Sequence, residues 1–205
     1  MNKTIRFWCI SVGIAMLWGC YAPTENSAAD KNKAPVDGKG EMVLFDFNSG
    51  SGISEWKSVN DTVMGGVSSG RMEKSETGKA SFTGTVSLEN NGGFASVRGP
   101  NLYRGVGEFE GLVVRLKGDG KKYKVGLRTD ELFDGVFHQA GFSTRKGEWQ
   151  EVKIPFTEFV PTFRGRRLSD DQRLKPAKIR SVSFLISDKQ QGPFRLEIDW
   201  VKAYR

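Results

Sequence analysis

Cysteine and histidine are nearly absent from this chain of 205 residues. Both cysteines, Cys9 and Cys20, lie in the first twenty residues, so the remainder has no thiol nucleophile, disulfide or zinc–thiolate site. His138 is the sole histidine, which excludes a multi-histidine metal centre. A Ser-His-Asp triad would need His138, but no nucleophile elbow accompanies it, so we predict a hydrogen-bonded core histidine. The sequence therefore predicts no catalytic residue, no metal site and no cofactor.

Long apolar runs and concentrated charge are absent as well. Hydrophobic residues make up 38% of the chain and charged residues 27%, which excludes a protein with many membrane spans and a disordered tail. The net charge of +7 is spread along the sequence and is not gathered in a recognition helix or a basic tail. Nucleic acid is therefore not expected as a partner.

The first twenty residues have the features of a targeting segment. A basic start precedes an apolar run over residues 7–19, shorter than the roughly 20 residues that a membrane-spanning helix needs. The run ends in Leu17, Trp18, Gly19 and Cys20. This ending resembles a bacterial lipobox, although a small residue usually stands where Trp18 does. We predict that residues 1–20 are a lipoprotein-type signal peptide with lipidation at Cys20; ordinary secretion is the alternative.

This interpretation has consequences for location and domain organisation. It predicts an exported, membrane-anchored bacterial lipoprotein, at the outer membrane or the periplasmic face of a host with two membranes. Residues 21–40 are small and polar without an apolar period, so we expect a flexible tether there. The folded domain is expected to span residues 41–205.

From residue 42 onward, apolar side chains recur at every second position. In the last repeat the apolar positions are Phe194, Leu196, Ile198 and Trp200. Such alternation is typical of antiparallel strands with one buried face. Turn signals rich in glycine separate the repeats, and only residues 169–175 could form a short helix. The sequence predicts an all-β fold, a single β-sandwich of about ten strands.

A basic face is predicted around the turn at residues 118–120. If this turn closes a hairpin, one side of it carries Arg115, Lys117, Lys122, Lys124 and Arg128. Like charges opposite one another destabilise a sheet, so something must offset them. Glu197 and Asp199 have the right parity for internal pairing, which we expect. The alternative is an anionic partner: an acidic glycan, a phosphate or an acidic protein surface.

The densest motif lies between residues 60 and 68. Its members are Asn60, Asp61, Met64, Gly65, Gly66 and Ser68. Asn and Asp side chains bind backbone amides in turns, and glycines permit positive φ or close backbone approach. One interpretation is a structural corner. The other is a loop that faces a ligand or partner, with Met64 as an adaptable apolar contact.

Three stretches together resemble the complex I intermediate-associated protein 30 family. They are WKSVNDTVMGGVS at residues 56–68, GLVVRLKGDGKKY at 111–123 and FRLEIDW at 194–200. The resemblance covers roughly residues 42–204. It implies a galactose-binding-like jelly roll without catalytic residues. It also implies a chaperone-like role in assembly of NADH:ubiquinone oxidoreductase.

Two functions follow from these observations. The first is a non-catalytic, lipid-anchored module of the assembly-factor type that binds protein partners. The alternative is a carbohydrate-binding module of the cell envelope, because aromatic rings stack on sugar faces. The aromatic candidates are Trp56, Tyr103, Phe133, Phe137, Trp149 and Phe163.

Overall fold

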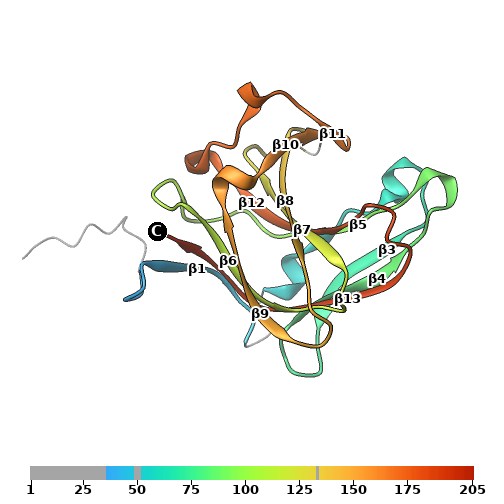
Figure 1. The fold of residues 1–205 in the computed structure, drawn as a ribbon, viewed down its shortest axis with the longest axis horizontal. Helices are drawn as coiled ribbons and strands as arrows, with labels where there is room; N and C mark the ends of the chain where they lie inside the picture. Colours follow the sequence, from blue (N-terminus) through green and yellow to red (C-terminus); the bar gives the residue numbers. More distant parts are fainter. Residues whose placement is uncertain (1–35, 49–51, 133) are drawn as a thin grey trace, which may run out of the picture. The chain divides into compact units, whose positions relative to one another are not determined.

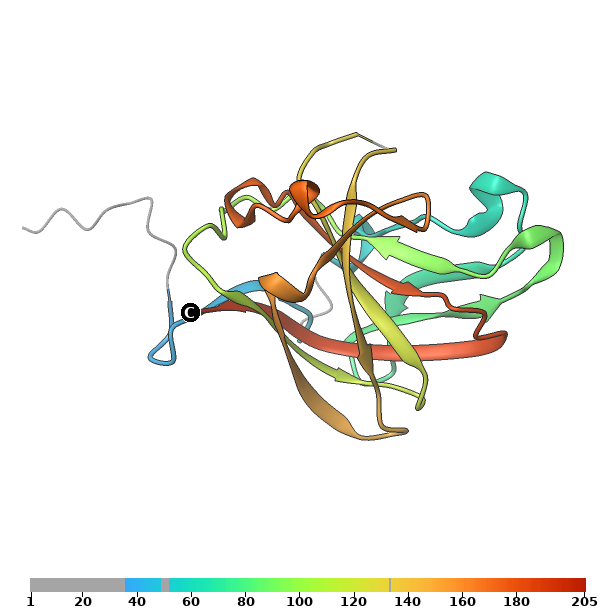
Figure 2. The same ribbon diagram turned by 45° about the horizontal axis from the view of Figure 1, so that its top comes forward.

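The alternating repeats form two antiparallel sheets packed face to face (Figures 1 and 2). The computed structural model describes residues 36–48, 52–132 and 134–205. Sheet A has the strand order β3-β4-β13-β6-β9, with β1 also paired to β13. Sheet B has the order β11-β10-β8-β7-β12-β5-β2. The predicted all-β sandwich is confirmed.

The strand bounds follow the predicted repeats. Sheet A consists of β1 (Glu41–Asp46), β3 (Ser69–Lys74), β4 (Ala80–Val86), β6 (Gly111–Lys117), β9 (Trp149–Pro155) and β13 (Gly192–Tyr204). Sheet B consists of β2 (Lys57–Ser58), β5 (Ala95–Arg98), β7 (Lys122–Arg128), β8 (Phe137–Ser143), β10 (Val160–Phe163), β11 (Arg166–Arg167) and β12 (Ser181–Ile186).

The helical segments among the described residues are 3₁₀ turns of three or four residues. They are η1 (Ile53–Glu55), η2 (Asp61–Met64), η3 (Glu89–Asn91), η4 (Phe156–Glu158), η5 (Asp170–Gln172) and η6 (Pro176–Lys178). The predicted short helix at residues 169–175 is η5. In this part of the chain, no helix has the length and apolar character needed to cross a bilayer.

The core lies between the two sheets. Phe82 and Leu196 face inward from sheet A, and Val125 and Phe184 face inward from sheet B. Trp56 is buried against them, with its ring centroid 5.6 Å from that of Phe184. The hypothesis that Trp56 is an exposed, sugar-stacking ring is therefore wrong, because this ring joins the core cluster where apolar burial favours it.

A β-bulge in β13 changes which side chains face the core. Between Ile198 and Trp200 the pairing with β6 shifts by one residue, so the inward parity changes. Val201 and Ala203 become fully buried, whereas Trp200 is half-exposed, with Lys202 Nζ 4.7 Å from its ring centre. The predicted burial of Trp200 is wrong for this reason.

The turn at residues 118–120 does not close a hairpin. Strand β6 is paired on both sides, with β13 and with β9, so β7 has no free edge there and enters sheet B. Arg115 and Lys117 therefore lie on sheet A, and the other three cations of the predicted basic face lie on sheet B. The prediction that these five cations share a single basic face is therefore wrong.

Internal pairing of the sheet A cations is confirmed. Arg115 Nε lies 3.1 Å from Asp199 Oδ2, and Lys117 Nζ lies 3.1 Å from Glu197 Oε1. Lys79 Nζ lies 2.5 Å from Asp199 Oδ1. Both acids are buried, so the cations that cover them compensate the cost of removing carboxylates from water.

We predict a measurable coupling between Arg115 and Asp199. Alanine at either position should lower the free energy of unfolding. A double-mutant cycle by chemical denaturation should give about 0.5–1 kcal/mol of favourable coupling, since Arg115 is partly exposed and solvent screens the pair. Arg71, which pairs with Glu73 on β3, is the control and should show no coupling to Asp199. Additive effects of Arg115 and Asp199 would contradict the pairing.

Because of the bulge, we predict that truncation of Leu196 and of Trp200 will differ in its effect on stability. Leu196→Ala should lower the free energy of unfolding by roughly 2–5 kcal/mol, because it opens a cavity between the sheets. Trp200→Ala should cost clearly less than this, because its ring is only partly buried and its removal opens no cavity between the sheets. Equal shifts of the two denaturation midpoints would show that Trp200 belongs to the core.

Candidate binding groove

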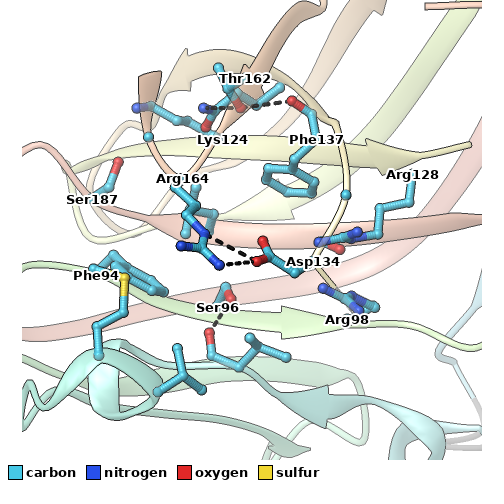
Figure 3. Close-up of a pocket in the computed structure, with 18 of the residues that line it drawn as sticks. Phe94, Ser96, Arg98, Lys124, Arg128, Asp134, Phe137, Thr162, Arg164 and Ser187 are labelled. Carbon is cyan, nitrogen blue, oxygen red and sulfur yellow. Dashed lines mark hydrogen bonds and ion pairs between the residues drawn. The ribbon is translucent and has the colours of Figure 1, made fainter. Parts of the chain in front are cut away.

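The outer face of sheet B carries a groove of about 390 Å³ (Figure 3). One wall is the loop at residues 60–68, through Val63 and Met64. The opposite wall is the β10–β11 turn, through Arg164 and Gly165. Both turn residues have positive φ, the conformation of the two-residue turns that fit the twist of paired strands.

Small residues at the floor of the groove leave space above the sheet. Ser183 on β12 lies opposite Arg98 on β5 and opposite Gly126 on β7. A Cβ atom at Gly126 would lie 1.9 Å from the Phe137 ring, so this ring packs directly over the β7 backbone. In this row two small residues, Ser183 and Gly126, lie between the long polar side chains of Arg98 and Gln139.

Two arginines contribute to the groove lining from different strands. Arg128 is only 7% exposed, and its Nη1 donates a 2.7 Å hydrogen bond to the Leu132 carbonyl and lies 3.8 Å from Asp130 Oδ1. Burial and the nearby charge of Arg128 lower the pKa of Arg98, and Asp130 opposes this effect. Burial also lowers the pKa of Arg128. Both guanidinium groups nevertheless stay charged at neutral pH, because arginine starts from so high a pKa.

The rim of the groove carries charges that are already paired. Arg164 and Asp134 form an ion pair and point toward each other in Figure 3, with Arg164 Nε 3.0 Å from Asp134 Oδ2. The hydrogen bond from Arg164 lowers the pKa of Asp134. Lys124 Nζ lies 2.8 Å from Asp188 Oδ1. The charges at the rim are thus paired with each other, and the two arginines lie deeper, at the floor.

Asp61 fixes the wall formed by residues 60–68. Its Oδ1 accepts a 2.9 Å hydrogen bond from Ser68 N, and its Oδ2 accepts bonds of 2.5 Å from Ser68 Oγ, 2.7 Å from Gly93 N and 3.2 Å from Phe94 N. Burial acts to raise the pKa of Asp61, but these hydrogen bonds outweigh it and hold the pKa below its usual value. One carboxylate therefore joins two loops, through bonds to residues 32 and 33 positions further along the chain.

The other polar members of the motif complete this corner. Asn60 Oδ1 accepts a hydrogen bond from Ser96 N, and Asn60 Nδ2 donates one to Gly70 O, each 3.2 Å long. Gly65 ends η2 with φ 90°, and a Cβ at Gly66 would lie 2.5 Å from Asp61 Oδ1. The structural-corner interpretation therefore holds for Asn60, Asp61, Gly65, Gly66 and Ser68.

The apolar members of the same loop face outward. Val63, Met64 and Val67 are 55%, 64% and 49% exposed. We call these three side chains the apolar knob. Val63 and Met64 also line the groove, so the knob and the groove form one continuous surface.

Of the remaining predicted positions, Lys124 and Arg128 line the groove, and Lys122 lies outside its lining. His138 is buried as predicted, with Nε2 2.8 Å from the Gln172 carbonyl oxygen. Cys20 lies outside the described residues. Across residues 36–48, 52–132 and 134–205, no three acidic, histidine or cysteine side chains gather as metal ligands would.

Sequence reasoning missed several lining residues. Arg98, Gln139 and Ser183 come from three strands, and only the strand order places them in one row. A local signal existed in Ser183, a small polar residue at an outward position between the buried Val182 and Phe184. Nothing local indicated that Arg98 and Arg128 lie near each other.

The chain is a β-sandwich of two antiparallel sheets with a groove on the outer face of one of them. The sequence profile described as "Complex I intermediate-associated protein 30 (CIA30)" matches residues 45–198. The chain belongs to this family.

The curated relatives carry the same description. "Complex I intermediate-associated protein 30, mitochondrial" of Mus musculus is 30% identical over 182 residues, covering 79% of this chain and 56% of that protein. Its counterpart in Drosophila melanogaster is 28% identical over 182 residues, covering 78% of this chain and 61% of that protein. The chain thus spans between half and two thirds of the length of these two relatives.

Solved structures show the same fold at low identity. The family 11 carbohydrate-binding module from Clostridium thermocellum, in complex with a β-1,3-1,4-mixed-linked tetrasaccharide, superimposes with a TM-score of 0.60 and 19% identity. The match covers 82% of this chain and 97% of that module. It supports the galactose-binding-like jelly roll that the family resemblance implied.

The predicted location is corrected by these relatives. The prediction of an exported, membrane-anchored bacterial lipoprotein is wrong, because the relatives from mouse, fly, nematode and Neurospora crassa are described as mitochondrial. The prediction depended on a short apolar run and a four-residue ending with Trp18 out of place, and different targeting segments share a basic, apolar start. The signal-peptide and lipidation assignments lie in residues 1–35, outside the described residues, and the comparisons give them no support.

The corner predicts a pH-dependent role for Asp61. Asp61→Asn should lower the free energy of unfolding by about 1–3 kcal/mol at pH 7, since three backbone N–H donors and one hydroxyl lose a charged acceptor. The folded pKa of Asp61 is lowered, so its contribution is complete above an unfolded pKa of about 3.9 and is lost as the pH falls through the folded value.

The difference between wild type and Asp61→Asn should therefore shrink below about pH 4, as measured by urea denaturation at several pH values. The exposed Glu76, changed to Gln, serves as the control and should have little effect. A difference that stays constant from pH 7 to pH 3 would contradict the role of the charged carboxylate.

Proposed function

We propose that this chain is a non-catalytic binding module that associates with a protein partner during assembly of NADH:ubiquinone oxidoreductase. Family membership supports the link to complex I intermediates, which the relatives' names record. Because the chain covers only part of these relatives, the partner-binding surface has to be argued from its own residues.

The observation that carries the proposal is the apolar knob. Val63, Met64 and Val67 expose apolar surface on a loop that the hydrogen bonds of Asp61 hold in place. Clustered exposed apolar side chains on a soluble domain mark interaction surfaces. Methionine adapts its shape to a partner, and a loop ordered in advance loses little entropy on binding.

The same surface favours protein over carbohydrate. A sugar site of the expected kind needs an exposed aromatic platform in the groove. Trp56 is buried, and the exposed candidates, Tyr103 and Phe163, lie outside the groove lining. Trp149 is half-buried beneath cations, with Lys117 Nζ 5.3 Å and Arg115 Cζ 5.8 Å from its ring centre. The likeness to carbohydrate-binding modules supports the fold and carries no argument about the ligand.

The proposal is tested by comigration in native gels. In the organism that encodes it, the tagged chain should migrate with subunits of NADH:ubiquinone oxidoreductase in particles smaller than the finished complex. Met64→Asp should reduce this fraction at least tenfold, because a charge would have to be buried at the contact.

Val43→Asp is the matched control. Val43 is 52% exposed on β1, away from the groove lining, so this variant should comigrate like wild type. Absence of wild-type comigration would overturn the proposed function. An undiminished Met64→Asp fraction would show that the knob is not the contact.

A further inference from the structure

The floor of the groove has the chemistry to bind a carboxylate. Arg98 and Arg128 line it from β5 and β7, with β12 between them (Figure 3). Asp130 Oδ1 lies 3.8 Å from Arg128 Nη1, and the charge of Asp130 acts on both arginines. Two guanidinium groups brought close together out of water repel each other, and an anion that entered between them would relieve this repulsion.

An unsatisfied hydroxyl lies in the same row. Ser183 is 3% exposed and lines the groove, and its Oγ finds no hydrogen-bond partner within the described part of the chain. Buried hydroxyl groups are normally hydrogen-bonded, so an orphan at a groove floor indicates a ligand atom that completes it. Ser183 lies directly opposite Arg98 in the sheet, so its hydroxyl can donate to the same carboxylate that Arg98 would bind.

A second orphan atom indicates what else the ligand carries. The side chain of Gln139 donates from Nε2 to Thr162 Oγ1 at 3.1 Å, and this bond orients the amide. Its Oε1 is buried without a partner among the described residues and is a pure acceptor. A ligand that satisfies both orphans needs an acceptor for the Ser183 hydroxyl and a donor for Gln139 Oε1, and the adjacent arginines favour an anionic acceptor. A peptide segment with an acidic side chain supplies both.

We propose that the groove receives an acidic side chain, Asp or Glu, from an extended segment of the protein partner. Its carboxylate binds Arg98, Arg128 and the Ser183 hydroxyl, and a backbone N–H of the segment donates to Gln139 Oε1. This inference rests on the proposed function, since it names the feature of the partner that the groove selects. The rim does not oppose entry, because Asp134 and Asp188 are already paired with Arg164 and Lys124.

Peptide selection tests the proposal directly. The full chain should be used to select from a phage-displayed library of random 12-residue peptides. The bound peptides should be enriched in Asp or Glu at one position. In fluorescence polarisation, a selected peptide should bind at least tenfold more weakly when this acid is replaced by its amide.

Variants assign the effect to the groove. Arg98→Gln should weaken the selected peptide at least tenfold, and Ser183→Ala several-fold. Ser183→Ala should unfold at the same temperature as wild type or higher, because its hydroxyl has no bond to lose. The exposed Arg104, changed to Gln, is the control and should bind like wild type.

Several outcomes would overturn the inference. The inference fails if the selection yields no bound peptides, or if the bound peptides are not enriched in Asp or Glu. It also fails if Arg98→Gln binds the selected peptide as tightly as wild type does. Arg98-dependent binding of inorganic phosphate alone would show a small-anion site, and binding lost on amidation of the peptide's C-terminus would show a terminal carboxylate as the ligand. Comigration of the wild-type chain uses neither a selected peptide nor an Arg98 variant, so the proposed function can stand while the groove inference fails.

Discussion

The pairing of strand β13 is the constraint on which the rest of the structure depends. Its thirteen residues pair with β4 and β6 and, at the carboxyl end, β1. Because β6 is held between β13 and β9, the chain after residue 117 cannot fold back onto it and must cross to the other sheet. The crossing places Lys124 and Arg128 on sheet B, where the groove lies. The position of the candidate site thus follows from a pairing made entirely in the opposite sheet.

The local pattern predicted the fold class because the alternation of apolar residues within each strand shows which of its faces is buried. Alternation at Phe194, Leu196 and Ile198 is visible in the sequence and is present in the structure. The bulge that exposes Trp200 is not visible, because it depends on how β6 aligns with β13. The pairing of Arg115 with Asp199 could be predicted from parity and charge. The separation of Arg115 from Lys124 could not, since a turn sequence does not say which sheet receives the next strand.

The motif at residues 60–68 shows why a dense pattern can be predicted while its role stays ambiguous. Its polar residues turn inward, and the charge of Asp61 is retained because four hydrogen bonds replace its water. Its apolar residues turn outward, which reverses the usual arrangement. The structural-corner interpretation therefore describes the polar side chains, and the partner-facing interpretation stays a proposal about the exposed apolar ones. The corner orders the loop during folding, so a partner that contacts Met64 would not have to order it again.

The distribution of charge around the groove favours selectivity over strong attraction at a distance. Paired charges at the rim produce little long-range field, so a passing acidic surface gains little from approach alone. The gain comes only where a carboxylate reaches the floor beside Arg128, which is nearly buried. In the proposed complex, a ligand without the charge would leave the repulsion between Arg98 and Arg128 in place, and a ligand without a donor would leave Gln139 Oε1 unsatisfied. The apolar knob supplies contact area that is indifferent to such detail. In the proposed complex, the knob would contribute affinity for a range of apolar partners, and the floor would distinguish among them.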